Sequence, residues 1–301
     1  MKIGFIGVGK LGKDVSEVIS EKHEVVGYDI EKIDTLIKMV DSVREAVFEK
    51  DIVFCAVPTP HHPDYDGKLP TSSLTPKNFN YDIVISTLAE INKHISKKTL
   101  VVLISTTLPG TIRSFLSNKI SKGRFIYNPY LIAQTTVKWD MKNPEMIIIG
   151  TENGEVDQDV DLLKSFYNDI CEIEPRFEIG TWEEAESIKI FYNTFITAKL
   201  CLVNMIQDTA MKIGNMNVDI VTKALKNSTT RIMGPSYMRA GLGDGGGCHP
   251  RDNIALRWLS NNYNFGYDLF DAIVTTREIQ SENIANFMID KSNSDNFVIL
   301  G

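Results

Sequence analysis

Short apolar runs alternate with stretches of helical periodicity through the first half of the chain. The runs are rich in valine and isoleucine and lack a polar face, which is typical of parallel strands buried on both sides. They cover residues 2–7, 24–29, 51–57, 99–105, 125–127 and 145–150. This alternation predicts an α/β domain over residues 1–180, built on a doubly wound parallel sheet.

The second half of the chain has the pattern of an all-helical domain. Residues 182–214 contain no internal glycine or proline and predict one long helix. Shorter helices are expected at 218–226, 250–260 and 268–291. Because the long helix is apolar on several sides, we expect it to form the centre of a helical domain over residues 181–293. We also expect it to pair two copies of the chain as a homodimer.

One connection in the first domain is too long to be a simple turn. Between Pro58 and Asn80 the chain carries five prolines and an Asp-Gly pair. Loops of this length inside a compact domain are usually functional or disordered. This loop follows the carboxyl end of a strand, where open α/β sheets bind ligands, so we expect it to be functional.

A glycine-rich turn joins the first strand to the following helix. Gly7, Gly9 and Gly12 have the spacing that permits a tight turn, close approach to a pyrophosphate and close helix–sheet contact. Asp29 ends the second strand about 20 residues on, where a carboxylate binds both ribose hydroxyls and repels a 2′-phosphate. The pattern therefore predicts a Rossmann domain that uses NAD rather than NADP. The predicted cofactor turn comprises Gly7, Gly9, Lys10, Leu11 and Gly12.

Two polar residues stand out on the long predicted helix. Lys189 and Asn193 lie one turn apart and hence on one face. Such a pair is suited to stabilising a developing oxyanion or orienting a reacting hydroxyl. Solvated helices carry the same spacing by chance, but Ile188 and Ile190 indicate buried surface nearby, and a buried lysine needs a reason.

Cys248 differs from the other three cysteines. It follows three glycines and precedes Pro250, a residue suited to the first turn of a helix. A helix N-terminus stabilises a thiolate, and the glycines leave room for a substrate. Cys248 is therefore the candidate nucleophile. The others, Cys55, Cys171 and Cys201, lie in apolar surroundings and are expected to be unreactive core residues.

Composition and charge indicate which partners and which cell compartment to expect. The chain of 301 residues has a net charge of −7, which gives no reason to expect nucleic acid or an anionic membrane as a partner. No run approaches the ~20 apolar residues of a membrane span, and the N-terminus lacks the layout of a signal peptide. The cysteines and histidines show no metal-ligand spacing, so no metal is expected. We expect a cytoplasmic protein whose thiols stay reduced.

Four ordered segments together resemble the nucleotide-sugar 6-dehydrogenases, the family of UDP-glucose and UDP-N-acetylmannosamine dehydrogenases. Residues 57–60 (VPTP) are similar to the family's VPTP, and residues 105–111 (STTLPGT) to its STVPVGT. Lys189 and Asn193 match its KxxxN pair, and residues 245–252 (GGGCHPRD) resemble its GGSCxxKD. The likeness covers nearly all of the chain.

The resemblance implies NAD-dependent oxidation of the C6 alcohol of a UDP-sugar to the uronic acid. Cys248 would trap the intermediate aldehyde as a thiohemiacetal, a second hydride transfer would leave a thioester, and water would release the acid. In this scheme Lys189 and Asn193 stabilise the oxyanion, Asp252 lies near the thiol and Thr106 positions water. The implied cofactor contacts add Val57, Pro58, Thr59, Ser105 and Thr106. The implied substrate contacts are Tyr130, Leu131, Gln134, Lys189, Asn193, Tyr237, Arg239 and Gly245, with Tyr237 and Arg239 on the base or the diphosphate.

The chain departs from that family in two places. The family's NPEFLxEG carries two glutamates where residues 128–135 have Tyr130 and Gln134. Neither side chain is a general base at neutral pH, so thioester hydrolysis lacks its usual carboxylate. Residues 294–301 resemble the first strand of the family's third domain, which helps to close over the nucleotide. We therefore expect a weaker affinity for the UDP-sugar than in relatives that have this domain.

Two other functions remain compatible with the sequence. An NAD-dependent 3-hydroxyacid dehydrogenase of the 6-phosphogluconate type also has a Rossmann start and a KxxxN helix, but it needs no cysteine in a glycine loop. A catalytically impaired NAD-binding relative is favoured by Tyr130, Gln134 and the end of the chain. The number of NADH molecules formed per UDP-sugar distinguishes the three.

Overall fold

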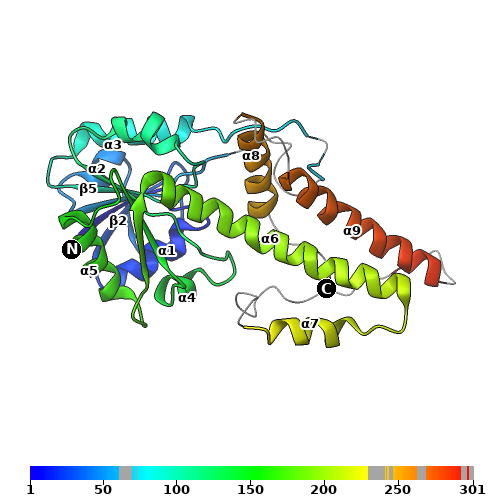
Figure 1. The fold of residues 1–301 in the computed structure, drawn as a ribbon. Coiled ribbons are helices and arrows are strands. Elements are labelled where there is room, and N and C mark those ends of the chain that lie inside the picture. The colour runs from blue at the N-terminus through cyan, green and yellow to red at the C-terminus, as the bar shows by residue number, and fades with distance from the viewer. Residues whose placement is uncertain are drawn as a thin grey trace. The chain divides into compact units, whose positions relative to one another are not determined.

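The computed structural model describes residues 1–60, 70–72, 74–229, 241, 243, 247–262, 269–292 and 297. The chain forms two compact units, which Figure 1 traces from the N-terminus in blue to the C-terminus in red. The first unit consists of Met1–Pro60 and Phe79–Ile190, and the second of His61–Asn78 and Phe191–Gly301.

The first unit is built on an eight-stranded sheet in the order β3-β2-β1-β4-β5-β6-β7-β8. Neighbouring strands are parallel except β6 and β7, which meet in antiparallel orientation. The predicted doubly wound, largely parallel sheet is confirmed, with its last two strands reversed. The strands are β1 (Lys2–Ile6), β2 (Glu24–Tyr28), β3 (Lys38–Met39), β4 (Ile52–Cys55), β5 (Leu100–Leu103), β6 (Arg124–Tyr127), β7 (Ile147–Thr151) and β8 (Phe177–Thr181).

The sequence pattern did not predict β3 and β8. β3 has two residues, which is too short for any periodicity to appear. β8 is half-buried along its whole length, because it lies at the edge of the sheet. An edge strand therefore lacks the continuous apolar run that identifies the central strands.

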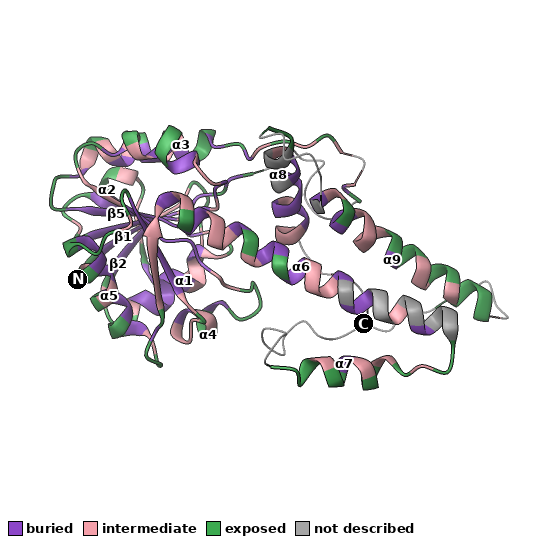
Figure 2. Cartoon of the chain, viewed as in Figure 1, coloured by how far each residue is buried: buried purple, intermediate pink, exposed green. Residues whose placement is uncertain are grey.

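Helices cover both faces of this sheet, and each face has its own hydrophobic core (Figures 1 and 2). The division follows from the strands, since successive side chains point to opposite faces. One face is covered by α1 (Gly12–Ser20), α4 (Val137–Lys142) and α5 (Gln158–Ile170). The other is covered by α2 (Val43–Val47), α3 (Asp82–His94), the helical segment Ile112–Leu116 and the start of α6 (Trp182–Ile213).

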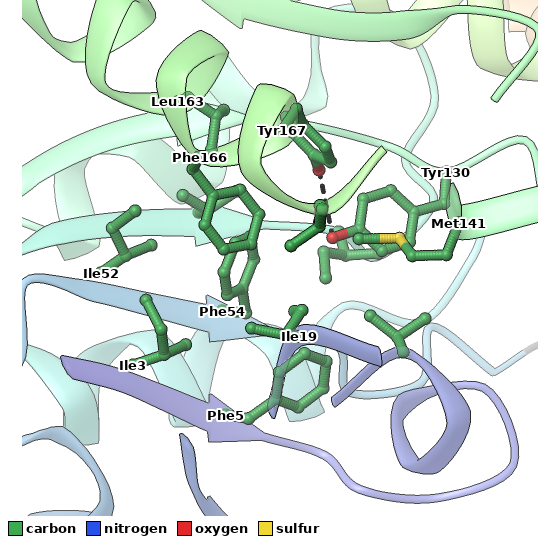
Figure 3. Close-up of a cluster of buried hydrophobic side chains, with 14 of the residues drawn as sticks. Ile3, Phe5, Ile19, Ile52, Phe54, Tyr130, Met141, Leu163, Phe166 and Tyr167 are labelled. Carbon is green, nitrogen blue, oxygen red and sulfur yellow. Dashed lines mark hydrogen bonds between the residues drawn. The ribbon is translucent and has the colours of Figure 1, made fainter. Parts of the chain in front are cut away.

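The core beneath α1 and α5 is aromatic at its centre (Figure 3). The rings of Phe5 and Phe54 are stacked with centroids 5.9 Å apart, and Phe166 from α5 lies 5.2 Å from Phe54. All three side chains are fully buried. Such aromatic contacts hold α5 on the sheet and keep β1 and β4 in place, and the carboxyl ends of these two strands lead into predicted cofactor residues.

The second unit is helical in its described part. Gly214 and Asn215 have φ values of 70° and 50°, and this left-handed turn ends α6. The side chain of Asn217 then caps α7 by accepting hydrogen bonds from two backbone N–H groups. The four predicted helices are confirmed with shifts at their ends, as α6, α7 (Val218–Lys226), α8 (Cys248–Asn262) and α9 (Leu269–Lys291). Among the described helices, none has the length and apolarity needed to cross a membrane.

The compact units and the domains expected from pattern divide the chain differently. The sheet ends at Thr181, beside the expected boundary near residue 180, but α6 packs on the sheet through Trp182 and Ala185 and belongs to the first unit as far as Ile190. Segment 61–78, expected in the first domain, belongs to the second unit. Long-range packing decides both points. The expected third-domain strand at 294–301 lies outside the described residues apart from Phe297.

Candidate functional site

The carboxyl edge of the sheet gathers most of the predicted cofactor residues. β2, β1, β4 and β5 are neighbours in the sheet and run in parallel, so the segments that follow them meet at one edge. Gly7 follows β1, Asp29 follows β2, residues 57–59 follow β4 and residues 105–106 follow β5. The fold thus collects at one edge residues that are far apart in the sequence.

The three glycines of the turn meet three different surroundings. Gly7 has a φ of +92°, and a Cβ there would lie 2.8 Å from the carbonyl group of Ala56. A Cβ on Gly12 would lie 1.9 Å from the carbonyl oxygen of Gly7, so no side chain fits where α1 begins. A Cβ on Gly9 would meet nothing closer than the Asp29 Oδ2 atom at 4.0 Å. The turn therefore has no room for a side chain at Gly7 or Gly12, whereas the space around Gly9 is open.

The surroundings of Gly9 fit a dinucleotide. The Asp29 carboxylate faces this opening with Oδ2, while its Oδ1 accepts a hydrogen bond of 3.0 Å from the N–H of Glu31. Leu11 stands at the N-cap of α1 and makes no side-chain hydrogen bond there, so no capping side chain blocks the approach of a phosphate to the start of the helix. Lys10 is exposed beside them.

Two hydrogen bonds, one buried and one partly buried, connect the loop after β4 with the loop after β5. The Ser105 hydroxyl donates to the carbonyl oxygen of Val57 at 2.5 Å, and the Thr59 hydroxyl donates to that of Thr106 at 2.9 Å. Val57, Thr59 and Ser105 are buried, whereas Thr106 is half-buried and Pro58 is exposed. These bonds hold the two loops in register at the edge where the glycine turn lies.

The side chain of Tyr130, a predicted substrate contact, lies in a hydrophobic core. Its ring is part of the core beneath α5, only 9% exposed, and its hydroxyl lies 3.2 Å from that of Tyr167 (Figure 3). Burial raises the pKa of Tyr130 far above neutrality, so the hydroxyl stays protonated. The side chain makes core contacts, because an aromatic ring is stabilised by burial there, and its contact with a substrate stays a prediction. Leu131 is half-buried and Gln134 is exposed.

Cys248 is the first residue of α8 and is half-buried. The helix begins two residues earlier than the sequence predicts, with the N–H of Arg251 donating to the carbonyl of Gly247 at 3.2 Å. Pro250 still fits, because the N–H that it lacks has no intrahelical partner in the first turn. The nucleophile candidate therefore lies within the N-terminal turn, and Asp252 follows one turn later on the same face.

Asp252 is fully buried and held from two helices. Its Oδ1 accepts two hydrogen bonds of 3.1 Å from the Nε and Nη2 atoms of Arg251, and its Oδ2 accepts one from the Nδ2 atom of Asn193 on α6. Asn193 is itself buried. The second unit thus brings together three predicted site residues, namely Cys248, Asp252 and Asn193.

The remaining predicted site residues divide between described and undescribed parts. Lys189 is half-buried on α6, one turn before Asn193, and counts with the first unit, as does Thr106. Tyr237, Arg239 and Gly245 lie outside the described residues. In the part of the chain that is described, no three histidine, cysteine or acidic side chains gather as a metal ion would require.

The other three cysteines have the surroundings expected of unreactive thiols. Burial raises the pKa of Cys55 to about 12 and that of Cys171 to about 11. Cys201 is buried with its Sγ atom 3.6 Å from the carbonyl oxygen of Ile273. The prediction that these three are core residues is confirmed for Cys55 and Cys201, and Cys171 is half-buried.

Sequence reasoning missed Glu186, a fully buried carboxylate on α6. It accepts hydrogen bonds from Thr107, Gly110 and Ile112, all in the loop after β5 and the segment that follows it. One signal was available. Glu186, Lys189 and Asn193 are three and then four residues apart, so they form one polar stripe along a mostly apolar helix.

Comparison with known proteins gives one family for both units. The NAD-binding-domain model of the UDP-glucose/GDP-mannose dehydrogenase family matches residues 34–171, and the family's central-domain model matches residues 183–278. UDP-glucose 6-dehydrogenase of Rickettsia typhi is 26% identical and aligns with 100% of this chain and 73% of its own length. The corresponding enzyme of Campylobacter jejuni is 27% identical over 99% of this chain and 80% of its own.

A solved structure has the same fold. The UDP-glucose dehydrogenase of the hyperthermophilic archaeon Pyrobaculum islandicum superposes with a TM-score of 0.77, at 22% identity, over 96% of this chain and 69% of that one. The matched NAD-binding domain, together with the opening at Gly9 and the facing Asp29 carboxylate, makes NAD the cofactor. Since two domain models of one family cover most of both units, the chain belongs to the UDP-glucose/GDP-mannose dehydrogenase family.

Proposed function

We propose that the chain is an NAD-dependent UDP-sugar 6-dehydrogenase that oxidises the C6 alcohol to the carboxylic acid. NAD, when bound, accepts a hydride at each of two oxidations. The alcohol loses a hydride and a proton to become an aldehyde, and the Cys248 thiolate adds to the aldehyde carbon as a thiohemiacetal. Loss of a second hydride and a proton gives a thioester, and water releases the acid and the thiol. The balance is one water consumed and two NADH formed per sugar.

The observation that carries this proposal is the hydrogen bond between Asn193 and Asp252, which lies one turn after Cys248 on α8. Among the four cysteines, Cys248 alone begins a helix, the kind of position where catalytic cysteines are found. The buried Asp252 carboxylate is fixed by Arg251 and Asn193 one turn further on. A rigidly held carboxylate and amide beside a thiol suit the stabilisation of a tetrahedral adduct.

Residues of the first unit would hold the cofactor and prepare the water. The glycine turn, Asp29 and the loops after β4 and β5 supply the NAD site, with Gly9 giving the backbone room to approach the pyrophosphate. Lys189 would stabilise the oxyanion, and Thr106 would orient the hydrolytic water. With Tyr130 buried in the core and Gln134 neutral, neither supplies a general base. We therefore expect thioester hydrolysis to limit the rate.

The number of NADH molecules formed per sugar tests the proposal. The protein is incubated with NAD and, separately, with UDP-glucose, UDP-N-acetylglucosamine and UDP-N-acetylmannosamine, and NADH and the sugar product are both quantified. We expect two NADH per sugar consumed and a uronic acid as the product. A burst of two NADH per protein, followed by a slow phase, would identify hydrolysis as the limiting step.

The same assay separates the alternatives. Oxidation of small 3-hydroxyacids, with one NADH each and no reaction of UDP-sugars, would replace the proposal with the 3-hydroxyacid dehydrogenase function. Binding of NAD in calorimetry without turnover of any sugar would instead identify a non-catalytic relative. One NADH per sugar, with the aldehyde as the released product, would contradict the role of Cys248.

We also propose that the chain forms a homodimer through α6 and acts in the cytoplasm, where its four free thiols would stay reduced. Phe191 and Phe195 lie one turn apart on α6 and are 44% and 52% exposed. Two partly exposed aromatic side chains one turn apart on a long helix support an interface there. Phe195→Glu is expected to convert a dimer to a monomer in analytical ultracentrifugation. The matched control Phe115→Glu, at a 55% exposed position of the first unit, should leave the dimer intact. A monomeric unsubstituted protein would refute the interface.

A further inference from the structure

The buried carboxylate of Glu186 has no part in the proposed reaction, although it lies one turn from Lys189 on α6. Its Oε1 atom accepts hydrogen bonds from the Thr107 hydroxyl at 3.0 Å and the Ile112 N–H at 2.9 Å. Its Oε2 atom accepts one from the Gly110 N–H at 2.6 Å. The side chain is fully shielded from solvent. Three donors from one loop therefore converge on a single side chain of another element.

The loop that Glu186 holds is the one that carries Thr106. On its N-terminal side this loop is fixed to the loop after β4, through Thr59 to the carbonyl of Thr106 and through Ser105 to that of Val57. In its middle, the hydroxyl of Tyr81 lies 3.2 Å from the N–H of Leu108 and 3.3 Å from the hydroxyl of Thr111. Glu186 supplies the anchor that comes from α6.

The two anchors on either side of Thr106 decide where its side chain stands. Thr59 holds its carbonyl, and Glu186 holds the next residue, Thr107, by its hydroxyl. Because Lys189 follows Glu186 by one turn of a continuous helix, the same carboxylate ties the helix that carries Lys189 to the loop that carries Thr106. Glu183, on the same helix, binds the side chain of Arg113 just after the loop, whereas Glu186 binds the loop itself at Thr107, Gly110 and Ile112.

We propose that Glu186 is a positioning residue that sets the Thr106 loop against the helix carrying Lys189. The proposal rests on the proposed function, since only there do Thr106 and Lys189 have roles in one reaction. Glu186 itself touches neither substrate nor cofactor in this account. Its effect passes through the backbone at Thr107, Gly110 and Ile112, and an error in position of about 1 Å costs up to ~100-fold in rate.

The ionisation of Glu186 gives the proposal a measurable signature. Burial raises its pKa to about 7, although the three donors oppose that rise and Glu183 on the same helix adds to it. The charged or titratable groups that face it from other elements are Tyr127 of β6 and Arg113 of the segment after the loop, with Tyr81 at the loop's other anchor. The ionised carboxylate accepts all three hydrogen bonds, whereas the protonated form carries a hydrogen that opposes one donor. The loop is therefore held fully only above about pH 7.

Ionisation of Glu186 has opposite effects on the position of the loop and on the stability of the protein: it holds the loop more firmly but lowers the free energy of unfolding. The pKa of Glu186 in the folded protein lies above the value of 4.5 for a free side chain. Stability from this group is thus present below pH 4.5 and is lost as the pH rises through about 7. Glutamine does not titrate, so Glu186→Gln lacks this loss of stability with rising pH. The melting temperature of the variant minus that of the unsubstituted protein should therefore increase from pH 5 to pH 8. Each unit of pKa shift corresponds to about 1.4 kcal/mol of stability.

The test compares Glu186→Gln with Glu183→Gln. Glutamine keeps the size and one acceptor oxygen but turns an N–H toward that of Gly110. We expect kcat to fall by about tenfold at pH 8 and the rise in kcat through pH 7 to disappear, with the KM for the UDP-sugar changed by less than about twofold. Glu183 is half-buried on the same helix and pairs with Arg113 at 2.6 Å, away from Thr107 and Gly110. Its variant should keep the kcat of the unsubstituted protein at pH 8 and a rise in kcat with pH, with the midpoint of that rise moved to lower pH because Glu183 contributes to the raised pKa of Glu186.

The affinity for NAD provides a second measurement, one that does not depend on oxidation of a UDP-sugar. The loop also lies at the predicted NAD site, so calorimetry should find NAD affinity increasing by about threefold or more through pH 7 in the unsubstituted protein and constant in Glu186→Gln. If no UDP-sugar is oxidised but this difference in NAD affinity is found, the proposed function fails and the positioning role stands. A variant that melts at a lower temperature, yet keeps kcat, NAD affinity and both pH profiles, would reduce Glu186 to a structural residue and overturn the proposal.

Discussion

Replacing Cys248 with serine is expected to lower NADH formation from a UDP-sugar by about 10³-fold or more. A serine hydroxyl in the first turn of α8 is not ionised at neutral pH, so it does not capture the aldehyde. Without the covalent adduct there is no C–H bond positioned for the second hydride transfer, and the first oxidation stays reversible. NADH absorbance, read together with mass spectrometry of the sugar, should find no uronic acid.

Cys171→Ser is the matched control for this result. Cys171 is also half-buried, but it lies in the first unit with its Sγ atom 3.8 Å from the carbonyl oxygen of Met141, and burial raises its pKa to about 11. Its variant should keep full activity. Two NADH per sugar from Cys248→Ser would mean that another group carries the acyl intermediate, and the assignment of the nucleophile would fall.

Gly9→Ala is expected to weaken NAD binding, whereas Gly12→Ala is expected to destabilise the fold. The methyl group of Gly9→Ala fits the folded protein, since a Cβ there meets nothing closer than 4.0 Å. It occupies the space through which the backbone approaches the pyrophosphate, so NAD affinity should fall by about 100-fold while the melting temperature is unchanged. The methyl group of Gly12→Ala would lie 1.9 Å from the Gly7 carbonyl oxygen, which should cost about 3 kcal/mol or more in the free energy of unfolding.

Calorimetry with NAD and urea unfolding of both variants measure the two effects independently. Each variant serves as the control for the other, because the same substitution is made at two positions three residues apart in one turn. The dinucleotide site would be in the wrong place if Gly9→Ala bound NAD with unchanged affinity. The structure of the turn would be wrong if Gly12→Ala were as stable as the unsubstituted protein.

Many of the site residues were identifiable before the structure, because each carries a local signal. The glycine turn follows from spacing, Asp29 from its place after the second strand, and Cys248 from the glycines and proline around it. Such signals depend on the conformation of a few consecutive residues. Sequence reasoning therefore identified candidate residues for the chemistry but not which buried polar groups pair.

The side chain of Tyr130 shows the limit of that reasoning. It occupies a position where the resembling family has a glutamate, and this led to the prediction of a substrate contact. The direction of its side chain depends on the space beneath α5, which Met141 and Tyr167 help to form from later parts of the chain. An aromatic ring is stabilised in that space, and no pattern around residue 130 records it.

The sequence by itself determined the strands of the central sheet, the cofactor turn and the long helix, because periodicity and apolar runs act over neighbouring residues. Tertiary structure alone decided the edge strands, the core position of Tyr130 and the contacts of Asn193 with Asp252 and of Glu186 with Thr107. Those last two pairs are separated by 59 and 79 residues. Their pairing follows from the need to give every buried polar group a partner, and only the packed fold decides which partner is within reach.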